Sequence, residues 1–235
     1  MTWSSMLGAP TGAIGVKPGG LRSGSEEEDM MHVGSRACEL DIALERYASG
    51  EPVVVLDDGG SGDFVAAADV ISTEVMARFI RLGSGFVQVA LPGTTCDRLW
   101  LPPMPCPDPA GPYGWQCVGV DAAVGITTGI SAVDRAHTAR LLADPDTGQD
   151  DLVRPGHVIP LRTRPDSHAG VAESAVALSM LAGRAPAAVI CSIVSPRDPL
   201  RMADADDLVF LAGTYDLPII DGAGLPLVRP SLAGV

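Results

Sequence analysis

The sequence predicts one mixed α/β (α+β) domain, in which a mixed β-sheet is flanked by helices. Short apolar or β-branched runs, such as residues 52–56 (PVVVL), are typical of buried strands. Segments with apolar residues at helical spacing, such as residues 132–143, lie between them. The two kinds of segment do not alternate strictly, and no repeat of fixed period occurs. This pattern favours a mixed sheet over a doubly wound parallel one.

Strands are predicted where apolar runs are short and bounded by turn residues. Asp57 and Asp58 open one such turn, a loop over residues 57–63 rich in Gly and Asp. Prolines crowd residues 102–112, which we expect to form an irregular loop. The predicted strands span residues 52–56, 64–70, 86–90, 115–122, 187–194 and 218–220.

Helices are predicted where apolar periodicity is framed by capping signals. Ser72 and Ser131 are the predicted N-caps, and Gly50 and Gly183 are the predicted stops. The predicted helices span residues 37–47, 72–80, 132–143, 173–182 and 203–215.

The chain divides into a predicted flexible tail and one domain. Residues 1–30 are rich in Gly, Ser and Pro and end close to an acidic run, so we expect a flexible tail. Residues 31–235 are the predicted domain. The N-terminus lacks a signal-peptide pattern and no apolar stretch would span a bilayer, so a cytoplasmic protein is expected.

Composition narrows the classes of partner. Sixteen Lys and Arg against 29 Asp and Glu give a net charge of −13, which disfavours nucleic acid and membrane surfaces as partners. The five cysteines form no CxxC pair, so neither a zinc site nor a disulfide framework is predicted. A small-molecule ligand remains the expected partner.

Three segments carry a specific resemblance. They read VVVLDD (residues 53–58), GITTGISAVDRAHT (125–138) and RPGHVIPLR (154–162). In this order and spacing the chain resembles the 3,4-dihydroxy-2-butanone 4-phosphate synthase family over roughly residues 38–221. The resemblance implies a homodimer with sites near the subunit interface. It also implies a Mg²⁺-dependent reaction that converts ribulose 5-phosphate to formate and dihydroxybutanone phosphate, a precursor of riboflavin.

The sequence departs from the family pattern at the positions that bind metal and substrate and carry out the reaction. The family loop DDEDRENEGD, with a metal-binding Glu and a substrate-holding Arg, is three residues shorter here and lacks both residue types. The family segment RGGHTEA aligns with residues 168–174, which puts Val171 in place of the metal-binding His and Ala172 in place of Thr. Gln88 replaces a Cys, and Ser192 replaces a catalytic Glu. Valine cannot ligate a metal, so we expect no metal and no cofactor.

Three residues are the predicted catalytic groups: His157, Asp57 and Asp58. The resemblance places His157 in the pocket, and an imidazole is the natural general base near neutrality. Asp57 and Asp58 follow a strand and could form an acid–base pair. A purely structural role, as turn aspartates or as a structural histidine, is the alternative.

Substrate binding is expected from hydroxyls, arginines and aromatic groups near these positions. Thr127, Thr128 and Ser131 lie at a predicted strand-to-helix turn, where helix capping is the alternative role. Tyr113 and Trp115 indicate a bulkier, more apolar ligand than a sugar phosphate. The remaining predicted binding residues are Ser84, Gln88, Cys117, Arg154, Arg162, His168, Glu173 and Ser192.

These replacements favour a repurposed, metal-independent enzyme. It would promote isomerisation, dehydration or cyclisation of an unphosphorylated, partly apolar metabolite in specialised, natural-product biosynthesis. One alternative is a non-catalytic ligand-binding protein or partner subunit. The other is retained 3,4-dihydroxy-2-butanone 4-phosphate synthase activity in riboflavin biosynthesis.

Overall fold

The computed structural model describes residues 40–57, 59–105, 115–164 and 170–225. The predicted tail, Asp58, Tyr113 and His168 therefore lie outside the described residues, as does most of the proline-rich loop. Within the described ranges, no helix combines the length and apolar character needed to cross a bilayer.

A seven-stranded mixed sheet forms the centre of the domain, in the order β4-β5-β3-β6-β2-β1-β7. Two neighbouring pairs are parallel (β1/β7 and β3/β5), and the other four are antiparallel. The mixed sheet predicted from the sequence is confirmed. The strands are β1 (Val53–Leu56), β2 (Gly62–Ala67), β3 (Gln88–Leu91), β4 (Val120–Ala122), β5 (Leu152–Arg162), β6 (Ala188–Ser192) and β7 (Ile219–Asp221).

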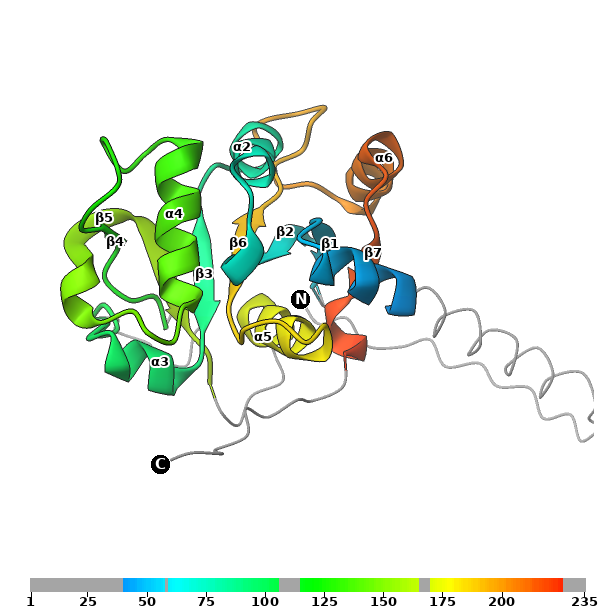
Figure 1. Ribbon diagram of the computed structural model, residues 1–235. Coiled ribbons are helices and arrows are strands. Elements are labelled where there is room, and N and C mark those ends of the chain that lie inside the picture. The colour runs from blue at the N-terminus through cyan, green and yellow to red at the C-terminus, as the bar shows by residue number, and fades with distance from the viewer. Residues whose placement is uncertain (1–39, 58, 106–114, 165–169, 226–235) are drawn as a thin grey trace, which may run out of the picture. The chain divides into compact units, whose positions relative to one another are not determined.

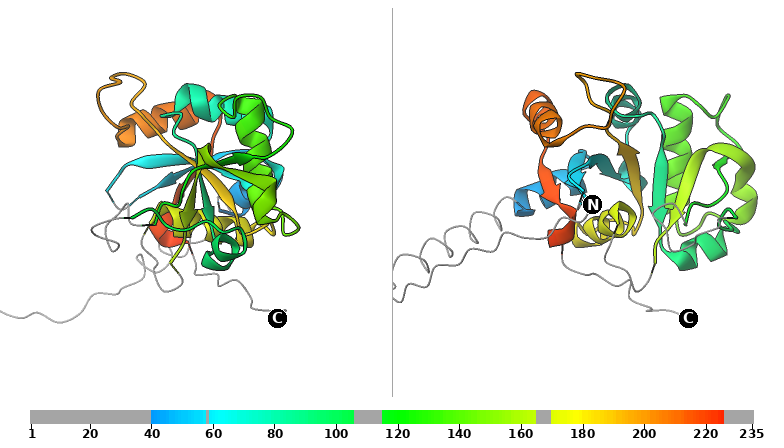
Figure 2. Two further views of the ribbon diagram at one scale, coloured as in Figure 1. Left: turned by 90° about the vertical axis from the view of Figure 1, so that its left-hand side faces the viewer. Right: turned by 180° about the vertical axis from the view of Figure 1, so that it is seen from behind.

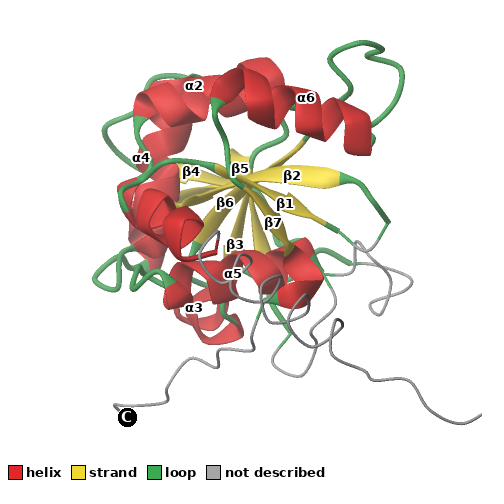
Figure 3. Cartoon of the chain, turned by 90° about the vertical axis from the view of Figure 1, so that its right-hand side faces the viewer, coloured by secondary structure: helices red, strands yellow, loops and turns green. Residues whose placement is uncertain are grey.

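Helices cover both faces of this sheet (Figure 3). One face packs against α2 (Thr73–Leu82), α4 (Ala132–Ala143) and α6 (Ala205–Tyr215). The other packs against α5 (Val171–Leu181) and the first helix, described over residues 40–48. Figure 2 shows how the strands fan out between these helices. A short helix, α3 (Gly93–Arg98), follows β3.

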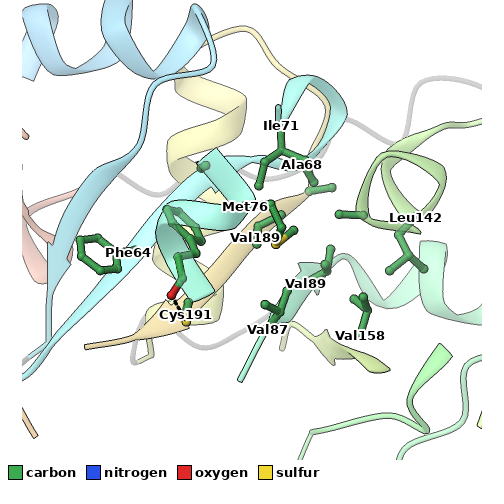
Figure 4. Packing of buried hydrophobic residues seen from close by; sticks show 14 of the residues in the cluster. Phe64, Ala68, Ile71, Met76, Val87, Val89, Leu142, Val158, Val189 and Cys191 are labelled. Atoms are coloured by element: carbon green, nitrogen blue, oxygen red, sulfur yellow. Dashed lines mark hydrogen bonds between the residues drawn. The ribbon is translucent and has the colours of Figure 1, made fainter. Parts of the chain in front are cut away.

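Alternation along the central strands produces two apolar cores. In β2, Phe64 and Ala66 point into the core beneath α2, α4 and α6, whereas Val65 and Ala67 point toward α5. Figure 4 shows Phe64 among the residues of the first core. Its ring stacks on that of Phe79, a residue of the same core, at a centroid distance of 5.5 Å. Both faces of these strands are buried, which explains their continuous apolar runs in the sequence.

Most predicted elements are observed, with shifts at their ends. Ser72 and Ser131 cap α2 and α4 as predicted, each accepting a hydrogen bond from the backbone N–H three residues later. Strand β2 begins at Gly62, inside the predicted loop, because Gly62 to Leu56 pairing continues the hairpin. Only three residues of the predicted strand 115–122 form β4. Helix α3 was not predicted, since its sequence GTTCDR has no apolar periodicity.

Candidate functional site

Strand directions bring the predicted site positions to one edge of the sheet. Strand β6 ends at Ser192, which pairs with Asp63 near the start of the antiparallel strand β2. The other antiparallel neighbour, β3, begins at Gln88, which pairs with Ile190, two residues before Ser192. Strand β5 is parallel to β3, and His157 comes just before Ile159, the residue paired with Gln88. We call this the polar edge, defined by Asp63, Gln88, His157 and Ser192.

Three of these side chains also share a face. Their strand neighbours Phe64, Val89 and Cys191 all belong to the core beneath α2, α4 and α6. Successive side chains of a strand point to opposite faces, so Asp63, Gln88 and Ser192 point toward the α5 side. The first turn of α5 lies near the same edge, because the Ser174 hydroxyl donates to the Gly222 carbonyl just beyond β7 at 3.2 Å.

His157 is held by a carboxylate that the sequence analysis missed. The Nδ1 atom of His157 lies 2.7 Å from Oδ2 of Asp121, and the His157 backbone N–H donates to Oδ1 at 2.9 Å. Asp121 is 5% exposed, whereas the His157 side chain is 42% exposed. The imidazole is therefore fixed on one side and open to solvent on the other. An acidic residue within the apolar run VGVDAA was the available sequence signal, since buried charges are normally paired.

Asp134 organises the loop before α4. Its carboxylate accepts hydrogen bonds from the Thr127 hydroxyl at 2.8 Å and from the backbone N–H groups of Thr127 and Gly129. The Thr127 hydroxyl lowers the pKa of Asp134, as do the other donors, against the opposing effect of burial. Thr127 and Ser131 thus have structural partners, and Thr128 is exposed between them.

Arg135 links this loop to the start of β3. Its Nη1 donates to the Gly85 carbonyl at 2.7 Å, while Nε is buried without a hydrogen-bond partner among the described residues. Burial lowers the pKa of Arg135, and the charges of Cys191 and Asp121 act in the opposite direction. Arg135 is therefore a buried cation held against the segment that leads into β3.

Asp57 stabilises a turn. Its Oδ1 accepts hydrogen bonds from the backbone N–H groups of Gly59 and Ser61, at 2.9 and 2.8 Å. This is the geometry of a turn aspartate, the alternative role considered for Asp57 from the sequence. Asp58, its predicted partner, lies outside the described residues.

Asp63, which is buried, pairs with the half-buried Ser192 at the polar edge. The Ser192 hydroxyl donates to Oδ1 of Asp63 at 2.7 Å. Burial raises the pKa of Asp63, the Ser192 hydrogen bond opposes this, and the nearby Asp57 charge adds to it. Nearby, Ser84 contacts the Cys191 thiol at 3.6 Å and accepts from the Phe86 N–H.

The first turn of α5 presents apolar residues where the family pattern has a ligand and a hydroxyl. Val171 and Ala172 pack against the core on the α5 face. Glu173, the next residue, accepts from the backbone N–H of Arg164 at 2.9 Å and lies 3.5 Å from its Nε. The carboxylate that the chain retains here is thus engaged with an arginine.

Among the described residues, no hydrogen bond or ion pair joins His157 to the predicted binding residues Arg154, Arg162, Cys117 and Trp115. Arg162 forms a two-point ion pair with Asp97 at 2.7 and 3.0 Å, which raises its pKa. Arg154 donates to backbone carbonyls, including that of Leu99 at 2.6 Å. Cys117 is fully buried, and the indole N–H of Trp115 is buried without a partner among the described residues.

The described residues do not fit a magnesium site. Within the described ranges, no three His, Cys, Asp or Glu side chains are grouped so that they could hold a metal ion. The carboxylates of Asp57 and Asp63 already accept hydrogen bonds from the chain itself. Asp57 accepts from its own turn, and Asp63 is buried and accepts from Ser192. Mg²⁺ prefers several hard oxygen ligands around one point, and this arrangement does not supply them.

The protein is thus a mixed α/β domain in which the carboxylate of Asp121 holds His157 at the polar edge. The chain belongs to the 3,4-dihydroxy-2-butanone 4-phosphate synthase family, whose profile matches residues 41–226. The resemblance stated from its motifs is confirmed.

Curated relatives are named for riboflavin biosynthesis. The chain is 45% identical over 192 residues to riboflavin biosynthesis protein RibBA of Nocardia farcinica (strain IFM 10152), covering 79% of this chain and 46% of that protein. It is 43% identical over 197 residues to RibBA of Rhodococcus jostii (strain RHA1), covering 81% and 47%. The chain therefore spans about half the length of the curated relatives it matches.

Solved structures agree with the fold. A crystal structure of 3,4-dihydroxy-2-butanone 4-phosphate synthase of Candida albicans matches with a TM-score of 0.72 and 40% identity, covering 78% of this chain and 93% of that one. Another structure of a 3,4-dihydroxy-2-butanone 4-phosphate synthase, in complex with two magnesium ions, matches with a TM-score of 0.72 and 36% identity, covering 78% and 92%.

These comparisons correct two expectations. The repurposed isomerase, dehydratase or cyclase of natural-product biosynthesis is wrong, because relatives at 41–45% identity over about four fifths of the chain are riboflavin biosynthesis proteins. The expectation of a cofactor-free family member is also wrong, because a solved relative holds magnesium. Similarity over the whole domain is thus a stronger indicator of function than a few replaced side chains.

Proposed function

We propose that the chain acts in riboflavin biosynthesis as a 3,4-dihydroxy-2-butanone 4-phosphate synthase, taking ribulose 5-phosphate and releasing formate. The similarity to RibBA proteins over about four fifths of the chain supports this assignment. Because the chain spans about half of those relatives, the proposal concerns this reaction alone and not their other activities.

The observation that carries the proposal is the held imidazole of His157. The family reaction includes enolisation, in which a proton leaves the carbon beside a carbonyl. A histidine whose Nδ1 is fixed by Asp121 and whose opposite side is exposed can accept and return that proton. We assign this role to His157, and substrate contacts at the same edge to Ser84, Gln88, Thr128 and Ser192.

A divalent cation, when bound, would polarise the substrate carbonyl and stabilise the enediolate. The described carboxylates do not form its ligand set, so no step is assigned to it. The steps assigned to the chain are those of its own side chains: binding the sugar phosphate at the polar edge and moving the proton at His157.

A formate assay tests the proposal. The purified protein is incubated with ribulose 5-phosphate and Mg²⁺, and formate is quantified against a protein-free blank. We expect formate release that falls at least about 100-fold in His157→Gln. His137→Gln is the matched control, since His137 lies on α4 and its Nε2 is 3.2 Å from the Val124 carbonyl. Its rate should stay within about twofold.

Binding of ribulose 5-phosphate without formate release would overturn the proposal and indicate a non-catalytic member of the family. Equal losses in the two histidine variants would remove His157 from the assigned role.

We also propose that the protein is a homodimer, as the family resemblance implies. Apolar side chains stand exposed beside the site: Phe86, Ile130 and Val133 are 49%, 57% and 56% exposed. A second subunit would bury them, as dimer interfaces bury contiguous apolar surface. Light scattering should give twice the 24.2 kDa chain mass, and Ile130→Asp should shift the protein toward the monomer. A monomer at micromolar concentration would contradict this.

A further inference from the structure

Asp121 uses both of its oxygens on one residue. Oδ1 accepts the backbone N–H of His157 and Oδ2 lies 2.7 Å from its Nδ1. A side chain that fixes both the backbone and the ring of one residue leaves that ring little rotational freedom. The two residues lie on adjacent strands, 36 positions apart, where the β4–β5 register shifts between Val120 and Asp121.

Two glycines make this approach possible. Gly129 has φ +82°, and a Cβ added there would lie 2.2 Å from Oδ2 of Asp121 and 2.7 Å from Nδ1 of His157. At Gly156, beside His157, an added Cβ would lie 2.0 Å from the Val120 carbonyl carbon. The backbone of both segments therefore packs directly on the pair, and the Gly129 N–H is itself held by Asp134.

The chemistry of the contact determines where the imidazole proton lies. An ionised carboxylate only accepts hydrogen bonds, so a neutral His157 must carry its proton on Nδ1 to satisfy Asp121. Nε2 then carries the lone pair, on a side chain that is 42% exposed. This is the form of histidine that acts as a base toward a substrate carbon acid.

We infer that Asp121 is a positioning residue that fixes His157 in the Nδ1–H tautomer and leaves Nε2 as the base facing substrate. The catalytic part of this inference rests on the function proposed above. The tautomer itself is a property of the free protein and can be measured without turnover.

Asp121→Asn gives a sharp test, because an amide presents one oxygen and one NH₂ where the carboxylate presents two oxygens. The His157 backbone N–H can only donate, so the amide oxygen is expected to face it. The NH₂ group then faces Nδ1, which must accept. The imidazole proton should therefore move from Nδ1 to Nε2 in the variant.

The readout is two-bond ¹H–¹⁵N correlation NMR of the histidine rings, recorded at a pH where His157 is neutral. His157→Gln assigns the signal by its loss. We expect Nδ1–H in the wild type, Nε2–H in Asp121→Asn, and Nδ1–H in Asp150→Asn. Asp150 is the matched control, an exposed carboxylate on the turn Gln149–Asp151 before β5.

Kinetics add a second readout. Asp121→Asn should lower kcat about 100-fold while KM stays within roughly threefold, because the base is misprotonated and substrate contacts remain. A purely structural role would instead change both parameters along with the thermal midpoint.

An Nε2–H tautomer in the wild type would overturn the inference, and this decides the question even if the variant does not fold. An unchanged tautomer in a folded Asp121→Asn would overturn it as well. If the wild type releases no formate but shows the Nδ1–H tautomer, the proposed function fails while the positioning by Asp121 stands.

Discussion

The two ends of the polar edge differ in what their side chains are bonded to. At the β4–β5 end, Asp121 holds His157 and leaves one side of the ring exposed. At the β1–β2–β6 end, Asp57 is bonded within its own turn and Asp63 is buried against Ser192. The β4–β5 end therefore has an imidazole that is held in place and open to solvent. The carboxylates of the other end are hydrogen-bonded within the protein.

This difference indicates which part of the family's chemistry the chain's own residues support. Proton transfer needs one oriented base, which the β4–β5 end provides. Cation binding needs several free oxygens around one point, which the described residues of the β1–β2–β6 end do not provide. Proton transfer is therefore the step of the proposed reaction that the described side chains support most directly.

Substituting Gly129 should have the largest effect on stability. Gly129→Ala combines a left-handed backbone with a Cβ only 2.2 Å from Oδ2 of Asp121. We expect the free energy of unfolding in urea to fall by about 3 kcal/mol. Gly183→Ala is the control, with φ +68° but no atom within 4 Å of the added Cβ, and should cost about 1 kcal/mol. Equal losses would show that Gly129 does not pack on the pair.

Restoring family residues at the β1–β2–β6 end should strengthen cation binding. The double variant Val171→His, Ser192→Glu adds a ring nitrogen on the first turn of α5 and a carboxylate beside Asp63. We expect Mn²⁺ affinity, measured by titration calorimetry, to rise about tenfold over the wild type. Val209→His on the exposed side of α6 should leave the affinity unchanged. No gain in the double variant would show that the two positions do not converge on one ion.

Asp57 should behave as a turn residue. Asp57→Ala removes the acceptor for the N–H groups of Gly59 and Ser61 and should lower the free energy of unfolding by about 1 kcal/mol. Asp57→Asn keeps an acceptor oxygen and should cost less than about 0.5 kcal/mol. Equal costs in the two variants would rule out the turn role.

The smallest effect is a pH dependence at Asp63. Its pKa is raised above 3.8 by burial, so its carboxyl favours folding below that pH and loses this contribution as the pH rises through the folded pKa. Asp63→Asn cannot ionise. Its unfolding free energy relative to wild type should therefore increase from pH 3 to pH 7, as measured by urea denaturation. A relative stability that falls over this range would reverse the sign of the shift.

Local signals predicted much of the fold, whereas contacts between distant residues could not be predicted. The β-branched run of β1 and the caps Ser72 and Ser131 depend on neighbouring residues, and they form as predicted. Asp121 lies 36 residues from His157, so no local pattern joins them. Local motifs also could not show that Arg162 is paired with Asp97, 65 residues away.

The most direct measurement is solvent exchange in ribulose 5-phosphate. The protein is incubated with this substrate and Mg²⁺ in D₂O, and deuterium at the carbons beside the carbonyl is followed by NMR. We expect incorporation well above a protein-free sample, and its loss in His157→Gln. Exchange no faster than in the protein-free sample would contradict proton transfer at His157.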